Sequence, residues 1–145
     1  MSRVLILYAT MSGNTEKVAL HISQEIPKVL PDNEVVLMDM MEATEDIFLG
    51  FDLIVIGSST WTDGEFNPIA EEFLGRLSES QIDFAMKKFA VFGLGESYYP
   101  RFCTIVEKTT DLVKSKNGDV IGEQLKLDGY VDENMLESIT VWITN

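Results

Sequence analysis

Residues 10–15 combine groups that could bind an anion. They read Thr-Met-Ser-Gly-Asn-Thr and stand between an apolar run, Val4 to Tyr8, and a segment with helical spacing. Their hydroxyl groups and carboxamide are neutral donors, and the first N–H groups of a helix have no partner within it. A Walker loop would need a lysine after the glycine. The pattern therefore predicts either a phosphate that stays bound and is not transferred, or a polar turn that Asn14 caps.

Residues 58–65 form a second polar segment, which follows the apolar run Leu53 to Gly57 and reads Ser-Ser-Thr-Trp-Thr-Asp-Gly-Glu. Trp61 stands among small polar residues just beyond a buried strand, whereas the helical spacing around Trp142 is typical of a packing residue. An indole at a ligand-binding edge can stack on an aromatic ligand. The alternatives are that Trp61 folds back on its own segment or contacts another protein.

Residues 93–103 form a third segment, which follows the apolar run Phe89 to Phe92 and reads Gly-Leu-Gly-Glu-Ser-Tyr-Tyr-Pro-Arg-Phe-Cys. Its two glycines would let backbone N–H groups approach a ligand closely, and its two tyrosines supply a second aromatic face. A dinucleotide fingerprint would need a third glycine where Tyr98 stands. Together the three segments predict a site for a flat, conjugated ligand with a single phosphate, and FMN has this shape.

The elements that must position these segments follow from the apolar patterning. The three apolar runs before them are short and continuous, which is typical of strands buried on both faces of a parallel sheet. Weaker runs at Val35 to Met38 and Gln124 to Leu127 are typical of edge strands. Apolar residues recur at helical spacing in four segments, namely 18–29, 69–77, 105–113 and 135–142. Pro27 predicts that the first helix kinks or ends near Ile26.

This order of elements, interpreted as a strand followed by a helix five times, predicts an α/β fold with an open, doubly wound sheet, because crossovers between parallel strands are right-handed. Ligands bind such sheets beyond the carboxyl ends of the strands, where the winding direction reverses. The three polar segments are therefore expected to meet at one edge of the sheet.

The composition limits the partners and the class of protein. The 145 residues, of which 46% are hydrophobic, predict one domain over residues 1–145. Twenty-four acidic residues against eleven Lys and Arg give a formal net charge of −13, which argues against nucleic acid and anionic membranes and favours basic protein surfaces. No apolar run approaches the ~20 residues that span a bilayer, and the stretch after Met1 is too short for a signal peptide. We therefore expect a cytoplasmic protein.

Cysteine and histidine usage gives little sign of further chemistry. Cys103 is the only cysteine of the sequence, so no intrachain disulfide can form. No metal cluster and no Cys-His or Ser-His-Asp arrangement stands out. We expect no metal and no catalysis beyond that of a bound cofactor.

On these motifs the chain resembles the flavodoxin family over essentially its whole length. Four segments carry the resemblance, namely Thr10-x-Ser12-Gly13-Asn14-Thr15, Thr60-Trp61, Tyr99-x-x-Phe102-Cys103 and Leu125-Lys126-Leu127-Asp128-Gly129. The resemblance implies five parallel strands in the order 2-1-3-4-5 with helices on both faces. The length, with no insertion splitting the fifth strand, fits the short-chain members.

The resemblance also implies FMN as the cofactor and a role for single residues. The residues expected to bind phosphate are Thr10, Ser12, Asn14, Thr15 and Ser59. Thr60 and Asp128 are expected to contact the ribityl chain, and Trp61 and Tyr99 to stack on the flavin. Glu96 and Cys103 are expected to donate to the flavin through their backbone N–H groups. The remaining expected cofactor-binding residues are Met11, Gly13, Thr62, Gly64, Gly93, Gly95, Tyr98 and Phe102. Two adjacent tyrosines leave open which one stacks, and the Phe-Cys register favours Tyr99. Many family members have glycine where Thr62 stands.

The function implied is that of a low-potential carrier of single electrons, not of an enzyme. Its expected partners are basic-surfaced redox proteins, with a reductase as donor and a ferredoxin- or flavodoxin-dependent enzyme as acceptor, and the carrier itself is expected to be a monomer. One alternative is an FMN-dependent NAD(P)H or quinone reductase on the same fold, and another is a non-redox interaction module. A receiver domain would need acidic residues where Ala9-Thr10 and Ser58-Ser59 stand, which excludes it.

Overall fold

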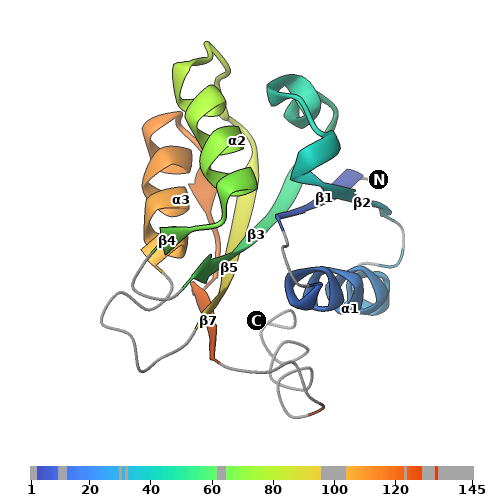
Figure 1. Cartoon of the computed structure of the whole chain (residues 1–145). Helices are drawn as coiled ribbons and strands as arrows, with labels where there is room; N and C mark the ends of the chain where they lie inside the picture. Colours follow the sequence, from blue (N-terminus) through green and yellow to red (C-terminus); the bar gives the residue numbers. More distant parts are fainter. Residues whose placement is uncertain are drawn as a thin grey trace.

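The fold is described from a computed structural model of the chain, which covers residues 3–9, 13–29, 31, 33–61, 65–95, 104–122, 124–128 and 133 (Figure 1). The strands are β1 (Arg3–Ala9), β2 (Glu34–Asp39), β3 (Leu53–Trp61), β4 (Glu65–Phe66), β5 (Lys88–Gly95), β6 (Asp119–Val120) and β7 (Leu125–Asp128). The α-helices are α1 (Asn14–Val29), α2 (Pro68–Glu79) and α3 (Thr104–Ser115), and two 3₁₀-helices are η1 (Met40–Glu42) and η2 (Glu45–Gly50).

The main sheet is parallel and has the predicted strand order. Its strands run β2-β1-β3-β5, and β6 and β7 both pair with β5, while β4 pairs antiparallel with β3. In the predicted numbering, β5 is the fourth strand, and β6 and β7 together form the fifth strand. The predicted order 2-1-3-4-5 is therefore confirmed.

The fifth strand consists of two short pieces, β6 and β7, which are separated by a small bulge and not by a long insertion, as expected of a short-chain member. Phe89 pairs with Val120 and Phe92 pairs with Leu125, so three steps along β5 correspond to five steps along β6 and β7. The two extra residues break the strand into two short pieces at the outer edge of the sheet.

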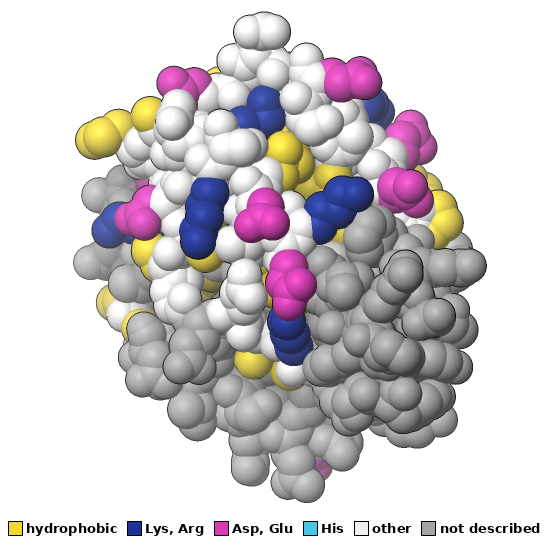
Figure 2. Space-filling model, turned by 90° about the vertical axis from the view of Figure 1, so that its left-hand side faces the viewer, with side chains coloured by type: hydrophobic (Ala, Val, Ile, Leu, Met, Phe, Trp, Pro, Cys, Tyr) yellow, Lys and Arg dark blue, Asp and Glu magenta, His cyan; other side chains and the backbone are white. Residues whose placement is uncertain are grey.

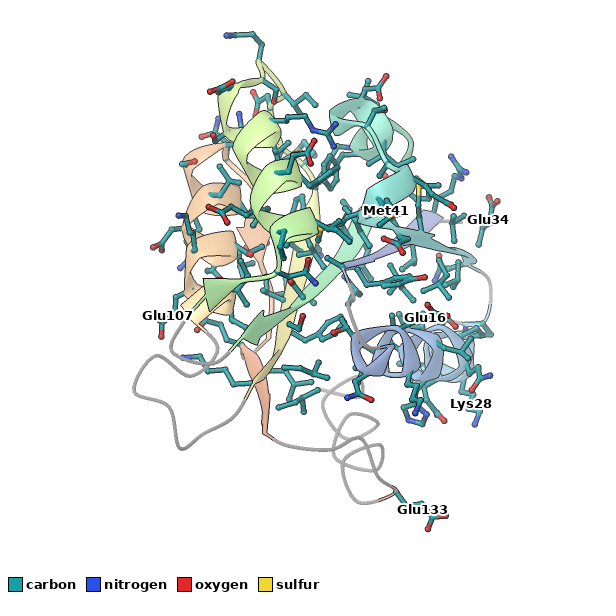
Figure 3. The ribbon with its side chains drawn as sticks, in the orientation of Figure 1. Glu16, Lys28, Glu34, Met41, Glu107 and Glu133 are labelled. Carbon is teal, nitrogen blue, oxygen red and sulfur yellow. The ribbon has the colours of Figure 1, made fainter. Side chains whose placement is uncertain are left out.

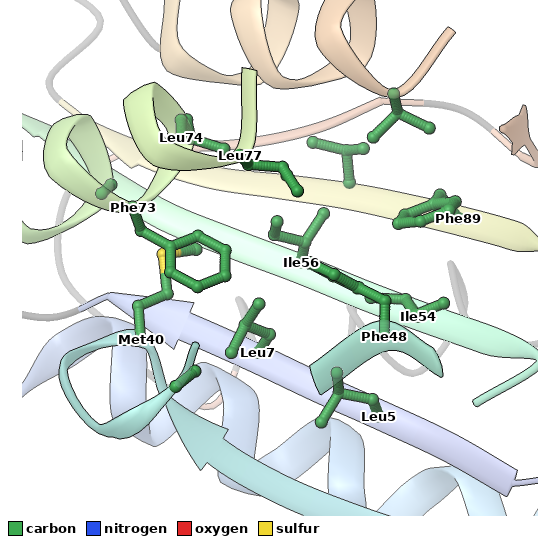
Figure 4. Packing of buried hydrophobic residues seen from close by; sticks show 14 of the residues in the cluster. Leu5, Leu7, Met40, Phe48, Ile54, Ile56, Phe73, Leu74, Leu77 and Phe89 are labelled. Carbon is green, nitrogen blue, oxygen red and sulfur yellow. The ribbon is translucent and has the colours of Figure 1, made fainter. Parts of the chain in front are cut away.

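Helices cover both faces of the sheet, as predicted. In Figure 1, α1 lies on one side, and α2 and α3 lie on the other. Alternate residues of β1 therefore enter two cores: Val4 and Ile6 pack with α1, whereas Leu5 and Leu7 pack with residues of α2 and α3 (Figure 4). This two-sided burial explains the continuous apolar runs.

Helix α1 differs from its prediction at both ends. The backbone N–H of Lys17 donates to the Gly13 carbonyl at 3.1 Å, so Gly13 rather than Asn14 stands in the capping position. The helix also continues past Pro27 to Val29. A proline this close to the end removes only one hydrogen bond of the helix, and few residues beyond it need support.

The connection between β2 and β3 contains no α-helix, so the predicted five-fold repeat of strand and helix is wrong there. The 3₁₀-helices η1 and η2 occupy it instead. The Asp39 side chain accepts a hydrogen bond from the Met41 backbone N–H at 2.9 Å, and Phe48 is fully buried. The helix predicted over residues 135–142 lies outside the described residues. None of the described helices has the length and apolar character needed to cross a membrane.

Candidate functional site

The carboxyl ends of neighbouring strands bring the three polar segments to one edge of the sheet. Ala9 pairs with Ser58, and Ser58 pairs in turn with Gly93. Gly95 pairs with Asp128 at the end of β7. The edge therefore joins the start of α1, the end of β3 and the end of β5, as the sequence predicts.

The start of α1 presents backbone N–H groups that have no acceptor within the helix. Gly13 has a φ of +92°, and a methyl group added there would meet nothing within 4 Å. The N–H groups that precede Lys17 have no partner within the helix. Thr15 is 1% exposed, and its hydroxyl has no hydrogen-bond partner among the described residues. A buried hydroxyl beside the first N–H groups of a helix fits a phosphate. Thr10, Met11 and Ser12 lie outside the described residues.

Ser59 and its neighbour Ser58 differ in how their hydroxyl groups are used. The Ser58 hydroxyl donates to the Ser59 carbonyl at 3.1 Å, and Ser58 is 4% exposed. The Ser59 oxygen accepts from the Asn67 amide nitrogen at 3.1 Å. Ser59 is among the residues expected from the sequence and Asn67 is not, although an asparagine directly before Pro68 is a helix-start signal.

The segment expected as a second loop is largely a hairpin. Residues Ser58 to Trp61 continue β3, and Thr60 and Trp61 pair antiparallel with Phe66 and Glu65. Polar residues can extend a strand when a neighbouring backbone pairs with them. The backbone of Thr60 and Trp61 is thus placed at the edge, while their side chains, and Thr62 and Gly64, lie outside what the structure describes.

Gly93 and Gly95 belong to β5 rather than to a loop. A methyl group at Gly93 would lie 2.4 Å from Cγ2 of Val106, so this glycine lets α3 pack closely on the sheet. That is a different reason from the predicted approach to a ligand. The backbone of Asp128 ends β7 beside Gly95. The other expected residues of this segment, namely Glu96, Tyr98, Tyr99, Phe102 and Cys103, lie outside the described residues.

Acidic side chains also act on Tyr8, near the carboxyl end of β1. Burial, and then the carboxylates of Glu16, Asp39 and Glu42, raise the pKa of the Tyr8 phenol. The phenol therefore stays neutral at neutral pH, and the three carboxylates come from three different elements. Within the described part of the chain, no group of three or more His, Cys, Asp or Glu side chains could hold a metal ion.

Comparisons with known proteins agree with this geometry. A family model described as flavodoxin matches residues 6–142. Probable flavodoxin 2 of Bacillus subtilis is 34% identical over 130 residues, which cover 88% of this chain and 83% of that protein. The crystal structure of oxidised flavodoxin 2 from Bacillus cereus has a TM-score of 0.89 and 36% identity, with 98% of this chain and 95% of that chain covered.

A more distant structure shares the fold alone. The Fusobacterium nucleatum flavodoxin, solved bound to flavin mononucleotide, has a TM-score of 0.77 at 22% identity and covers 99% of this chain and 96% of its own.

Proposed function

The chain belongs to the flavodoxin family, and on this premise we propose that the carboxyl edge of its sheet holds FMN without a covalent bond. Flavodoxins are electron-transfer proteins and not enzymes. Bound FMN takes up and gives off single electrons, which is the chemistry that a carrier needs. A quinone reductase or a non-redox interaction module is not favoured, because the matched proteins are flavodoxins.

The donor set at this edge is the observation that carries the proposal. The Thr15 hydroxyl is buried at the start of α1 with no hydrogen-bond partner in the described part of the chain, and Ser59 lies near the end of the adjacent strand β3. Neutral donors of this kind bind a phosphate without transferring it. We assign phosphate binding to residues 10–15 and Ser59, and flavin and ribityl contacts to the remaining residues expected from the sequence.

The charges around Tyr8 support a low reduction potential. The carboxylates of Glu16, Asp39 and Glu42 act on the Tyr8 phenol at the carboxyl end of β1. A negative field of this kind opposes the addition of further negative charge to a group bound at the same edge.

A matched pair of serine variants tests where the phosphate binds. We expect Ser59→Ala to weaken FMN binding by roughly 10- to 100-fold, because a hydrogen bond to a charged group is lost. Ser58→Ala should leave FMN affinity unchanged, because the Ser58 hydroxyl already donates to the Ser59 carbonyl. Quenching of flavin fluorescence during titration of the apoprotein measures both affinities.

Wild-type apoprotein that fails to take up FMN would contradict the proposed function. An equal loss of affinity in Ser58→Ala and Ser59→Ala would leave the function in place and contradict the assignment of Ser59.

We propose that the partners are basic-surfaced redox proteins, a reductase that donates and a ferredoxin- or flavodoxin-dependent enzyme that accepts electrons. The face over α3 is mixed in charge, because Lys and Arg side chains lie among Asp and Glu side chains in Figure 2. Glu107 of α3 forms an ion pair with Lys126 at 2.6 Å. Glu16 lies on the opposite side of the sheet from Glu107 (Figure 3). We therefore place docking at the edge that carries Glu16, Asp39 and Glu42.

Salt should slow this docking. With a net charge of −13, we expect the rate of electron transfer to a basic partner to fall at least tenfold between about 0.01 and 0.15 M ionic strength. Stopped-flow mixing at a series of salt concentrations measures this rate. A rate that does not change with salt would contradict electrostatic docking.

We also propose that residues 1–145 form one domain that acts as a monomer in the cytoplasm. The family model spans residues 6–142 as one unit, and self-repulsion at a net charge of −13 disfavours association. Light scattering at physiological salt would detect a dimer, which would contradict the monomer.

A further inference from the structure

The side-chain amide of Asn67 has only one possible orientation. Asn67 is fully buried, and its Oδ1 accepts from the backbone N–H groups of Ile69 at 2.9 Å and Ala70 at 3.4 Å. Because N–H groups can only donate, the atom that faces them must be the oxygen. The amide nitrogen therefore faces the Ser59 Oγ, which it reaches at 3.1 Å. A flip would leave two helix N–H groups without an acceptor.

This orientation determines what the Ser59 hydroxyl can do. A serine hydroxyl has one hydrogen to donate and lone pairs to accept with. Asn67 occupies a lone pair, and an amide nitrogen accepts nothing in return. Among the described residues none accepts from the Ser59 hydroxyl, whereas the Ser58 hydroxyl donates to a backbone carbonyl. No described residue thus uses the hydrogen of Ser59, which makes it available to an acceptor such as a bound phosphate.

The pairing of the strands places this donor beside the start of α1. Ser59 pairs with Leu94, and paired residues point to the same face of a sheet. Leu94 packs in the core that contains Val18 and Ala19 of α1. The same face therefore carries the Ser59 donor and the start of α1, whose first N–H groups have no acceptor within the helix.

We propose that Asn67 is a positioning residue, which commits the Ser59 hydroxyl to donate to the phosphate of the bound nucleotide. This inference rests on the proposed function, since it requires a phosphate at this edge. In this role Asn67 acts through the Ser59 hydroxyl. It connects the start of α2 to the end of β3, so the capping of one helix sets the polarity of a hydroxyl in the binding site.

Asn67→Asp reverses that polarity while keeping the helix cap. One carboxylate oxygen still accepts from Ile69 and Ala70, and the other now accepts the Ser59 hydrogen, which turns the hydroxyl lone pairs toward the ligand. We expect FMN binding to weaken by roughly 10- to 100-fold or more, the range for one lost charge-assisted hydrogen bond. Riboflavin, which lacks the phosphate, should bind within about threefold of wild type, which separates a lost phosphate contact from a general loss of folding.

Two further variants separate hydroxyl polarity from charge and from folding. Asn67→Ser keeps a good cap, adds no charge and is too short to reach Ser59, so it should weaken FMN binding less than Asn67→Asp does. In a Ser59→Ala background, most of the effect of Asn67→Asp on FMN binding should disappear. These results together would support the positioning role.

An effect of Asn67→Asp that is the same size with and without the Ser59 hydroxyl would overturn this inference, because it would show that charge or misfolding acts alone. Unchanged FMN affinity in Asn67→Asp would overturn it as well. If wild type binds no FMN, the proposed function fails together with the inference. If wild type binds FMN and the two substitutions are not coupled, only the positioning role fails.

Discussion

Replacing Gly57 with alanine is expected to destabilise the protein by about 3 kcal/mol, at the upper end of the usual cost of overpacking. A methyl group at Gly57 would lie 2.1, 2.2 and 2.4 Å from three ring atoms of Phe92. Phe92 is 1% exposed and packs in the core on the α1 side, so its ring cannot move aside without displacing other core residues. Urea unfolding of the apoprotein measures the change in the free energy of unfolding.

A second glycine provides the matched control for this prediction. Gly75 lies in α2, and a methyl group there would meet nothing within 4 Å. Gly75→Ala should therefore stabilise the protein by about 0.5–1 kcal/mol. Combining Gly57→Ala with Phe92→Leu should cost less than the sum of the two single changes. If the double variant loses as much stability as the two single variants added together, the contact with Phe92 is not the cause of the destabilisation by Gly57→Ala.

The consequence of this overpacking should reach the binding site. Gly57 directly precedes Ser58 and Ser59 in β3, so a shift of the strand moves the Ser59 donor relative to the start of α1. We expect the variant to lose FMN affinity as well as stability.

The parallel sheet with helices on both faces could be predicted from the apolar pattern because the relevant physics is local, whereas the strand order 2-1-3-4-5 came from the resemblance to the flavodoxin family. A strand covered by helices on both faces must be apolar at successive positions, and the runs Val4 to Tyr8 and Phe89 to Phe92 fall inside β1 and β5. The alternation of strands and helices then leaves few topologies. The edge at which the polar segments meet follows from the same reasoning.

The extent of β3 and the role of Asn67 could not be predicted in the same way. Ser58 and Ser59 interrupt the apolar pattern, yet the backbone of β5 and the hairpin with β4 keep Ser58 to Trp61 extended. The contact of Asn67 with Ser59 spans eight residues and depends on that hairpin. A pattern of residue types contains no information about such a partner.

The reason for glycine at positions 57 and 93 could not be predicted from residue types either. From the sequence, glycine at a ligand edge indicates a backbone that approaches the ligand. In the structure, each leaves room for an apolar side chain distant in the sequence, Phe92 in one case and Val106 in the other. The need for glycine there comes from tertiary packing.

Replacing Phe48 with alanine is expected to cost about 3–5 kcal/mol, the usual cost of emptying a large aromatic position in a core. Phe48 is fully buried, and its ring centroid lies 5.0 Å from that of Phe84, 6.0 Å from Phe73 and 6.1 Å from Phe89. It lies in η2, and a short 3₁₀-helix has little stability of its own. Phe48 is therefore expected to contribute much of the packing that holds the connection between β2 and β3, together with Met40 and Phe51, and urea unfolding measures its contribution.

The neighbouring Leu49, which is 68% exposed, provides the control for this change. Leu49→Ala should alter the free energy of unfolding by less than about 0.5 kcal/mol. If Phe48→Ala cost no more than that, the connection would be held by its backbone hydrogen bonds and not by the aromatic cluster. Because η1 in the same connection carries Glu42, which acts on Tyr8 at the carboxyl end of β1, loosening the connection should also weaken the negative field at the cofactor edge. A cluster on the α2 and α3 side of the sheet would then influence electron transfer without contacting the flavin.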